Sequence, residues 1–164
     1  MMIVDVLKSS ELFKGLEARY LEKVAPLCRG ASFQEAVRLF KEGDEAKELY
    51  VLTEGQVALE IEVRPVPDRP AIPTAVEVVT KGEAFGWSAL VEPHVYTSSA
   101  RCLSNCQVLA IRGDRLRRIM DDDPGLGYGL MKQLAKLVSV RLTHTRLRLT
   151  SGLGLILLGK ETGK

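Results

Sequence analysis

The stretch "LYVLTEGQVALEIEV", residues 49–63, decides the fold class. Residues 49, 51 and 53 (Leu, Val, Thr) alternate with Tyr50 and Leu52. After Gly55, the apolar residues 57, 59, 61 and 63 alternate with residues 58, 60 and 62. Alternation with a period of two is typical of a β-strand, and the glycine between the two runs, Gly55, is typical of a turn. The pattern therefore predicts a β-hairpin centred on Gly55.

Further strand and turn signals lie on both sides of this stretch. Gly43-Asp44 and Lys81-Gly82 mark turns, and the runs "AVEVVT", "SSARCL" and "QVLAI" read as short strands. The segment "RPVPDRPAIP" holds four of the seven prolines, which predicts an extended surface loop because proline lacks the N–H that a strand ladder uses. Short strands at this spacing predict a mainly β fold, an antiparallel β-barrel or jelly roll (a double-stranded β-helix).

Helical periodicity flanks the strands. Residues 16–27 read as an opening helix, residues 114–121 as a short helix with Asp114 as N-cap, and residues 124–150 as a long helix capped by Asp123. We expect one domain over residues 1–150, followed by a glycine-broken tail at 151–164 with no helix-turn-helix domain.

The long helix carries one apolar stripe that is too long for a small domain to cover. A partner helix is the natural cover, so we expect a homodimer through residues 124–150, weakened by Leu134→Glu; the alternative is that the helix folds over its own domain. The stripe consists of Met131, Leu134, Val138, Leu142, Thr145 and Leu149.

Composition limits the function classes. The chain of 164 residues is 46% hydrophobic and 27% charged, which is typical of a globular domain, and it has no apolar run near the ~20 residues of a membrane span. No signal peptide is legible, and three cysteines suit reduced thiols, so we expect a cytoplasmic protein. No acid lies between Pro124 and Lys160, which indicates either a solvated helix face or a surface for an anionic partner.

Four segments in order resemble the cyclic nucleotide-binding domain found in catabolite activator-type regulators, kinase regulatory subunits and gated channels. They are "LFKEGD" at 39–44, "LYVLTEGQVAL" at 49–59, "FGWSAL" at 85–90 and "SSAR" at 98–101. The resemblance covers residues 12 to about 150 and implies a signal-transduction domain of jelly-roll fold. It implies no enzymatic activity.

The resemblance also implies a phosphate-binding cassette. In the family a glycine and a short helix present N–H groups to the cyclic phosphate, an arginine neutralises that phosphate, and a glutamate accepts from the ribose hydroxyl. An ungapped match places Trp87 at the glutamate and Tyr96 at the arginine, so both charged contacts are missing. Arg101 replaces the arginine only if it faces the pocket, and strand alternation leaves its face open.

Candidate ligand contacts follow from this match, for a nucleotide-like or anionic small ligand whose identity stays open. Thr145 is included because a threonine of the long helix reaches the purine in the family, although threonines on a helix seam more often serve packing. The candidates are Phe85, Gly86, Trp87, Ser88, Ala89, Leu90, Tyr96, Thr97, Ser98, Ser99 and Thr145.

The remaining residues give little support for catalysis. His94 and His144 are fifty residues apart and lack the short spacing of metal ligands, and no Ser-His-Asp or Cys-His arrangement is legible. We therefore expect no catalytic or metal site. The favoured function is a regulatory or sensor domain that does not bind ordinary cyclic AMP or cyclic GMP. The alternatives are a ligand-free protein-interaction module with an unknown partner and, more weakly, a fragment of a transcription regulator without sequence-specific nucleic-acid binding of its own.

Overall fold

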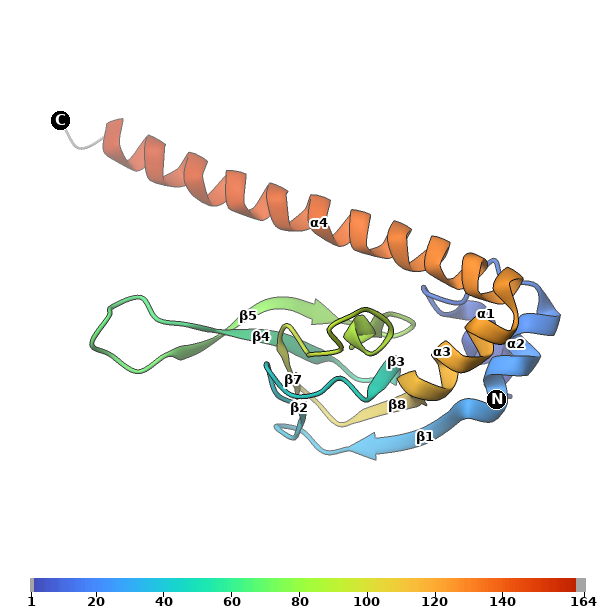
Figure 1. Ribbon diagram of the computed structural model, residues 1–164. Helices are drawn as coiled ribbons and strands as arrows, with labels where there is room; N and C mark the ends of the chain where they lie inside the picture. Colours follow the sequence, from blue (N-terminus) through green and yellow to red (C-terminus); the bar gives the residue numbers. More distant parts are fainter. Residues whose placement is uncertain (1, 162–164) are drawn as a thin grey trace.

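Two four-stranded antiparallel sheets form the centre of the computed structural model, which describes residues 2–161 (Figure 1). One sheet has the order β1 (Cys28–Phe33), β8 (Cys106–Arg112), β3 (Glu48–Glu54) and β6 (Ala84–Phe85). The other has the order β2 (Arg38–Phe40), β7 (Ser99–Cys102), β4 (Val57–Val63) and β5 (Ile72–Val79). The predicted β-rich jelly roll with flanking helices is confirmed, as two sheets that do not close into one barrel within the described residues.

The predicted hairpin at Gly55 is wrong, although both of its strands exist. β3 pairs with β6 and β8, whereas β4 pairs with β5 and β7 in the other sheet. Gly55 has a φ of 90°, and a Cβ there would lie 2.3 Å from the Asn105 carbonyl oxygen. The glycine thus lets the chain pass from one sheet to the other. The prediction failed because alternation identifies a strand but not the strand with which it pairs.

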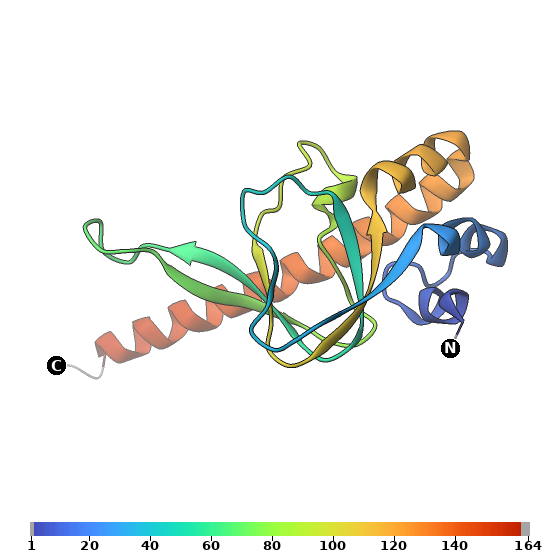
Figure 2. The ribbon, with the colours of Figure 1, turned by 90° about the horizontal axis from the view of Figure 1, so that it is seen from below.

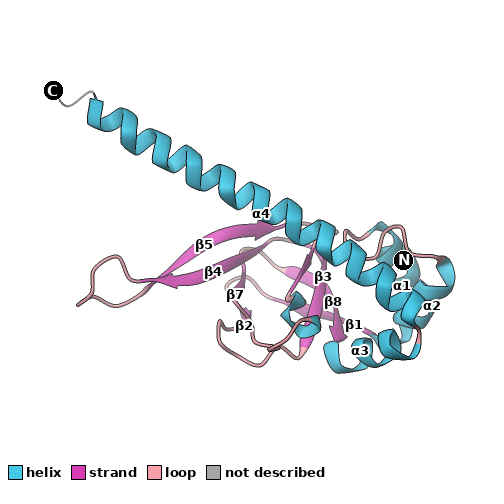
Figure 3. Ribbon diagram, turned by 45° about the horizontal axis from the view of Figure 1, so that its top comes forward, coloured by secondary structure: helices cyan, strands magenta, loops and turns pink. Residues whose placement is uncertain are grey.

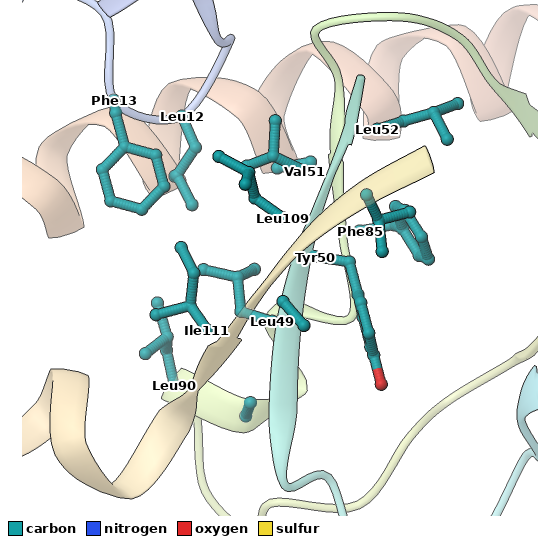
Figure 4. Close-up of a cluster of buried hydrophobic side chains, with 14 of the residues drawn as sticks. Leu12, Phe13, Leu49, Tyr50, Val51, Leu52, Phe85, Leu90, Leu109 and Ile111 are labelled. Carbon is teal, nitrogen blue, oxygen red and sulfur yellow. The ribbon is translucent and has the colours of Figure 1, made fainter. Parts of the chain in front are cut away.

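Strand β3 is buried on both faces and forms the middle of the core (Figure 4). Leu49 lies opposite Ile111, and Val51 lies opposite Leu109, on the face that looks toward Leu12 and Phe13 of the N-terminal segment. On the other face of β3, the ring of Tyr50 stacks on that of Phe85. This second face points toward the other sheet, where the Tyr50 ring also stacks on Phe40 of β2.

The N-terminal helices differ from the single predicted helix at 16–27. The chain forms α1 (Ile3–Ser9), α2 (Ala18–Val24) and a 3-10 turn η1 (Ala25–Leu27). The α-helix ends at Val24 because Pro26 has no N–H to donate to the preceding turn. The short helix is present as α3 (Gly113–Asp122), but its N-cap is Arg112, and Asp114 lies inside the first turn.

The long helix α4 (Pro124–Glu161) crosses over the sheets and continues past them (Figures 1 and 3). Asp123 caps it, because its Oδ1 accepts the Leu126 N–H at 3.3 Å. The expected end near residue 150 is wrong, since the helix passes through Ser151 and Gly152 and reaches Glu161.

The face of α4 that packs on the domain is not the predicted stripe. Leu134 belongs to the buried face, but Met131, Val138, Leu142 and Leu149 are at least 40% exposed. The inward residues are Leu126, Leu130, Leu134, Leu137 and Arg141, spaced by four, four, three and four.

Strands β4 and β5 extend beyond the rest of the sheets as a long ribbon on the same side as the far half of α4 (Figures 1 and 2). Residues 64–71 of the proline-rich segment join them as a loop whose side chains are almost all exposed. The last two residues of the predicted loop, Ile72 and Pro73, belong instead to β5. Among the described residues, no helix combines the length and the apolar character that a membrane span requires.

Candidate functional site

The cassette backbone has the glycine turn and the short helix that the family resemblance implies. After β6, Gly86 adopts a left-handed conformation with φ 74°, and the 3-10 helix η2 (Trp87–Leu90) follows. A Cβ at Gly86 would lie 3.1 Å from the Glu48 carbonyl oxygen and 3.3 Å from the Tyr96 ring. Only glycine fits this position without strain, so the turn of the cassette is retained.

Tyr96, which the sequence match predicts at the family's arginine position, is part of the core. Its ring stacks on Phe40, with centroids 3.7 Å apart and planes inclined at 11°, and the residue is 5% exposed. Its hydroxyl donates to the Glu48 carbonyl oxygen at 2.7 Å and accepts the Glu48 N–H at 3.2 Å. Burial raises the pKa of Tyr96. The position therefore presents a neutral, fully hydrogen-bonded phenol.

Two further rings complete an aromatic cluster of Phe40, Tyr50, Phe85 and Tyr96 between the sheets. The Tyr50 ring lies 5.2 Å from that of Phe85 and 5.8 Å from that of Phe40. The Tyr50 hydroxyl donates to Glu48 Oε2 at 3.0 Å, and burial raises the pKa of Tyr50. Stacked rings of this kind contribute apolar surface and no positive charge for a phosphate.

Arg101 is already paired. Its Nη2 and Nε donate to Glu60 Oε1 at 2.6 and 3.0 Å, and Glu60 is 5% exposed. The nearby hydroxyl of Ser99 accepts the Glu42 N–H at 2.9 Å and so fastens the loop between β2 and β3. Both groups serve the fold in this structure.

Trp87 faces the long helix. The guanidinium carbon of Arg141 lies 4.5 Å from the Trp87 ring centroid. Arg141 also forms ion pairs with Glu77 at 3.0 Å and Glu11 at 3.4 Å, and it donates to the Ala84 carbonyl oxygen at 2.7 Å. Burial raises the pKa of Glu77, although the charge of Arg141 acts in the opposite direction.

Arg141 is the residue that sequence reasoning missed. It continues the inward spacing of Leu126, Leu130, Leu134 and Leu137, so the helical period carried a signal for it. The signal was overlooked because an arginine in a basic segment without acidic residues is usually interpreted as part of a solvent-exposed helix face.

The remaining candidates are distributed between core and surface. Ala89 and Leu90 are buried, Ser88 and Ser98 are half-buried, and Thr97 is exposed. Thr145 is exposed, and its hydroxyl donates to the Arg141 carbonyl oxygen of its own helix at 2.9 Å. The structure thus brings Phe85, Gly86 and Tyr96 together and leaves Thr145 outside the group; the ligand contact of Thr145 stays a prediction.

A groove of about 810 Å³ opens beside the aromatic cluster, and Tyr96 contributes to its wall. Charged side chains of both signs surround it, and several are paired with each other, as in Arg112–Asp114 at 2.8 Å and Lys47–Glu45 at 3.4 Å. Its lining therefore has no single dominant charge.

Comparisons with known proteins agree with the fold. A solved structure of a candidate cyclic nucleotide-binding protein from Geobacter metallireducens is 32% identical, with a TM-score of 0.75, over 87% of this chain and 99% of that chain. A cyclic nucleotide-binding domain from Methylobacillus flagellatus has the same fold, with a TM-score of 0.76 at 16% identity over 92% of this chain and 82% of its own.

A curated relative is the CRP-like cAMP-activated global transcriptional regulator of Mycobacterium tuberculosis, 23% identical over 132 residues. The match includes 80% of this chain, which spans a little more than half of the relative, 57%. The sequence model of the family described as "Cyclic nucleotide-binding domain" matches residues 31–123, which is more than half of the chain. The protein therefore belongs to the cyclic nucleotide-binding domain family.

Proposed function

We propose that this protein is a dimeric regulatory domain that does not hold cyclic AMP or cyclic GMP in the family's cassette. Domains of this family are regulatory and not catalytic, so the chain is not an enzyme. The observation that carries the proposal is Tyr96, whose ring and hydroxyl are both engaged where the resemblance implies a phosphate-binding arginine. We place the domain in the cytoplasm, in keeping with its three free cysteines.

Two charged contacts are absent from the cassette. Hydrogen bonds to charged groups contribute ~1.5–3 kcal/mol each, so the loss of both weakens binding by roughly 3–6 kcal/mol. At 1.4 kcal/mol per tenfold change, this corresponds to about two to four orders of magnitude in affinity. Arg101 offers no compensation while its guanidinium is paired with Glu60.

Isothermal titration calorimetry with both cyclic nucleotides tests the proposal. We expect no binding tighter than about 100 μM, by the same affinity arithmetic. Micromolar binding by the unmodified protein would show that other groups hold the phosphate, and the proposal would fail.

An exposed face of α4 supports the dimer. Its uncharged residues alternate in steps of three and four, the spacing of a coiled-coil seam. Four of its apolar side chains are between 40% and 63% exposed, and a fifth, Tyr128, is 72% exposed, so the seam is uncovered in one copy of the chain. A second copy of the same helix offers the complementary surface. The seam consists of Tyr128, Met131, Ala135, Val138, Leu142, Thr145 and Leu149.

For nucleic acid we propose only weak binding without sequence preference. The basic side chains of α4, such as Lys132, Lys136 and Arg146, are exposed and suit phosphate contacts that salt screens. Fluorescence anisotropy should show equal, salt-sensitive binding to a duplex and to its scrambled version. Nanomolar binding that distinguishes the two at physiological salt would instead favour a transcription regulator.

A further inference from the structure

Arg141 is a buried charge with contacts to four separate segments. The residue is 9% exposed, although it lies on a helix that is otherwise exposed nearby. It stacks on Trp87 of the cassette helix, pairs with Glu77 of β5 and with Glu11 between α1 and α2, and donates to the Ala84 carbonyl oxygen of β6. We call these contacts the Arg141 clasp. A guanidinium suits this role because it both stacks on a ring and donates in several directions.

The clasp is located where α4 leaves the domain. Leu126, Leu130, Leu134 and Leu137 are buried before it, and every residue from 142 to 152 is exposed. Among the side chains of α4 that the structure describes, those through residue 152, Arg141 is therefore the last buried one. Beyond it, Arg148 donates to the Val76 carbonyl oxygen from an exposed position. The docking of the helix near the cassette thus depends strongly on Arg141.

One nitrogen of the clasp is incompletely satisfied. Arg141 Nη1 is buried and has no hydrogen-bond partner among the described residues. A buried donor without a partner is unfavourable, and release of the side chain would return it to water. The ion pairs and the stack on Trp87 favour the docked position of Arg141, whereas the unpaired Nη1 favours its release into water. These opposed contributions suit a contact that opens and closes reversibly.

We infer that Arg141 holds the long helix against the cassette through contacts within the chain itself, so that docking of the helix requires no small ligand. Release of the clasp frees the helix from about residue 137 onward and changes how it presents its seam. The inference rests on the proposed function in one respect, namely that no cyclic nucleotide separates Trp87 from Arg141.

The single tryptophan of the chain makes the clasp directly measurable, because all tryptophan fluorescence comes from Trp87. The test compares the full chain with Arg141→Met, which keeps the long apolar stem, and with Arg146→Met as a control on an exposed arginine of the same helix. We expect Arg141→Met to red-shift the emission and to raise acrylamide quenching several-fold. Amide exchange across residues 137–145 should be faster by about tenfold or more, as for a locally opened segment. Arg146→Met should match the wild type.

Glu77→Gln is the second variant, in case Arg141→Met does not fold. It keeps the size of the side chain and removes one ion pair of the clasp, so Trp87 quenching and helix exchange should change in the same direction by a smaller amount. Folded Arg141→Met, judged by circular dichroism, with wild-type quenching and exchange would overturn the inference. So would an unchanged Glu77→Gln if Arg141→Met is unfolded.

The clasp and the proposed function fail on different observations. Tight binding of a cyclic nucleotide in calorimetry contradicts the proposed function, whereas the clasp is judged by Trp87 and amide exchange in nucleotide-free protein. A nucleotide that binds and exposes Trp87 to acrylamide would contradict the proposed function alone, because displacement of Arg141 by a ligand requires the contact with Trp87 in the free protein.

Discussion

The phenol ring of Tyr96 lies against the ring of Phe40 at 3.7 Å, and its hydroxyl is bound to the backbone of Glu48 on the neighbouring strand β3. The side chain thus links the cassette loop, β2 and β3 from inside the domain. The resemblance leads us to expect a ligand-binding charge at this position, and in this protein the position holds a core residue.

Tyr96→Phe should lower stability without changing the fold. The substitution keeps the stack on Phe40 but leaves the carbonyl and N–H of Glu48 without their partner, which costs about 1–2 kcal/mol. We expect a melting temperature lower by a few degrees, measured by calorimetry or circular dichroism. Tyr128→Phe is the matched control: Tyr128 is 72% exposed in one copy of the chain and lies on the proposed seam, so the melting temperature of this variant should match the wild type when both are measured at a protein concentration that keeps them monomeric. Equal effects of the two variants would contradict the role of the Tyr96 hydroxyl.

The double variant Trp87→Glu with Tyr96→Arg should gain affinity for cyclic AMP. It returns both charged groups that the resemblance implies to a cassette whose Gly86 turn is intact. We expect at least about a tenfold gain over the unmodified protein in calorimetry, from one restored charged contact. Adding Arg141→Met should raise affinity further, because Arg141 otherwise pairs with the new glutamate. A folded double variant with no gain would show that the cassette backbone is not competent.

Leu142→Glu should weaken the dimer by about tenfold or more, since it places a charge in the uncovered seam of α4. Analytical ultracentrifugation at micromolar protein measures the effect. Val140→Glu, the same kind of change at an exposed apolar residue on the side of the helix opposite the seam, is the control. A wild type that sediments as a monomer at high concentration would refute the dimer.

Leu134→Glu, by contrast, does not isolate the dimer contact. Leu134 is 3% exposed inside its own domain, so a glutamate there buries an unpaired charge in the core. We expect this variant to lose the folded state itself.

Asp123 should make the start of α4 sensitive to acid. Its hydrogen bond with Lys23, and then the Leu126 N–H that it caps, hold the pKa of Asp123 below its usual range. Because the folded pKa is depressed, this stabilisation is present above the unfolded pKa and is lost as the pH falls through the folded pKa, below about pH 4. Asp123→Asn should therefore lower the melting temperature at pH 7, and its difference from the wild type should shrink toward pH 2. Asp122→Asn, on a neighbouring exposed carboxylate, should show no such convergence.

Local patterns in the sequence determined much of this protein. Alternation identified β3 and β4 as strands, and Asp123 and Pro124 marked the start of α4. The family resemblance implied a short helix after the cassette glycine, and η2 follows Gly86. Trp87 and Tyr96 were also legible as departures from the family. Each of these features depends on a residue and its near neighbours in the chain, so the amino-acid sequence alone is sufficient to predict it.

Tertiary structure alone decided the features that depend on distant partners. It placed β3 and β4 in different sheets, paired Arg101 with Glu60, and turned Arg141 toward Trp87. It also selected which face of α4 is buried, because several apolar rows on that helix satisfy the same period and only the shape of the domain beneath distinguishes them. Periodicity reports that an element has a buried face; the contacts that choose the face come from residues far away in the chain.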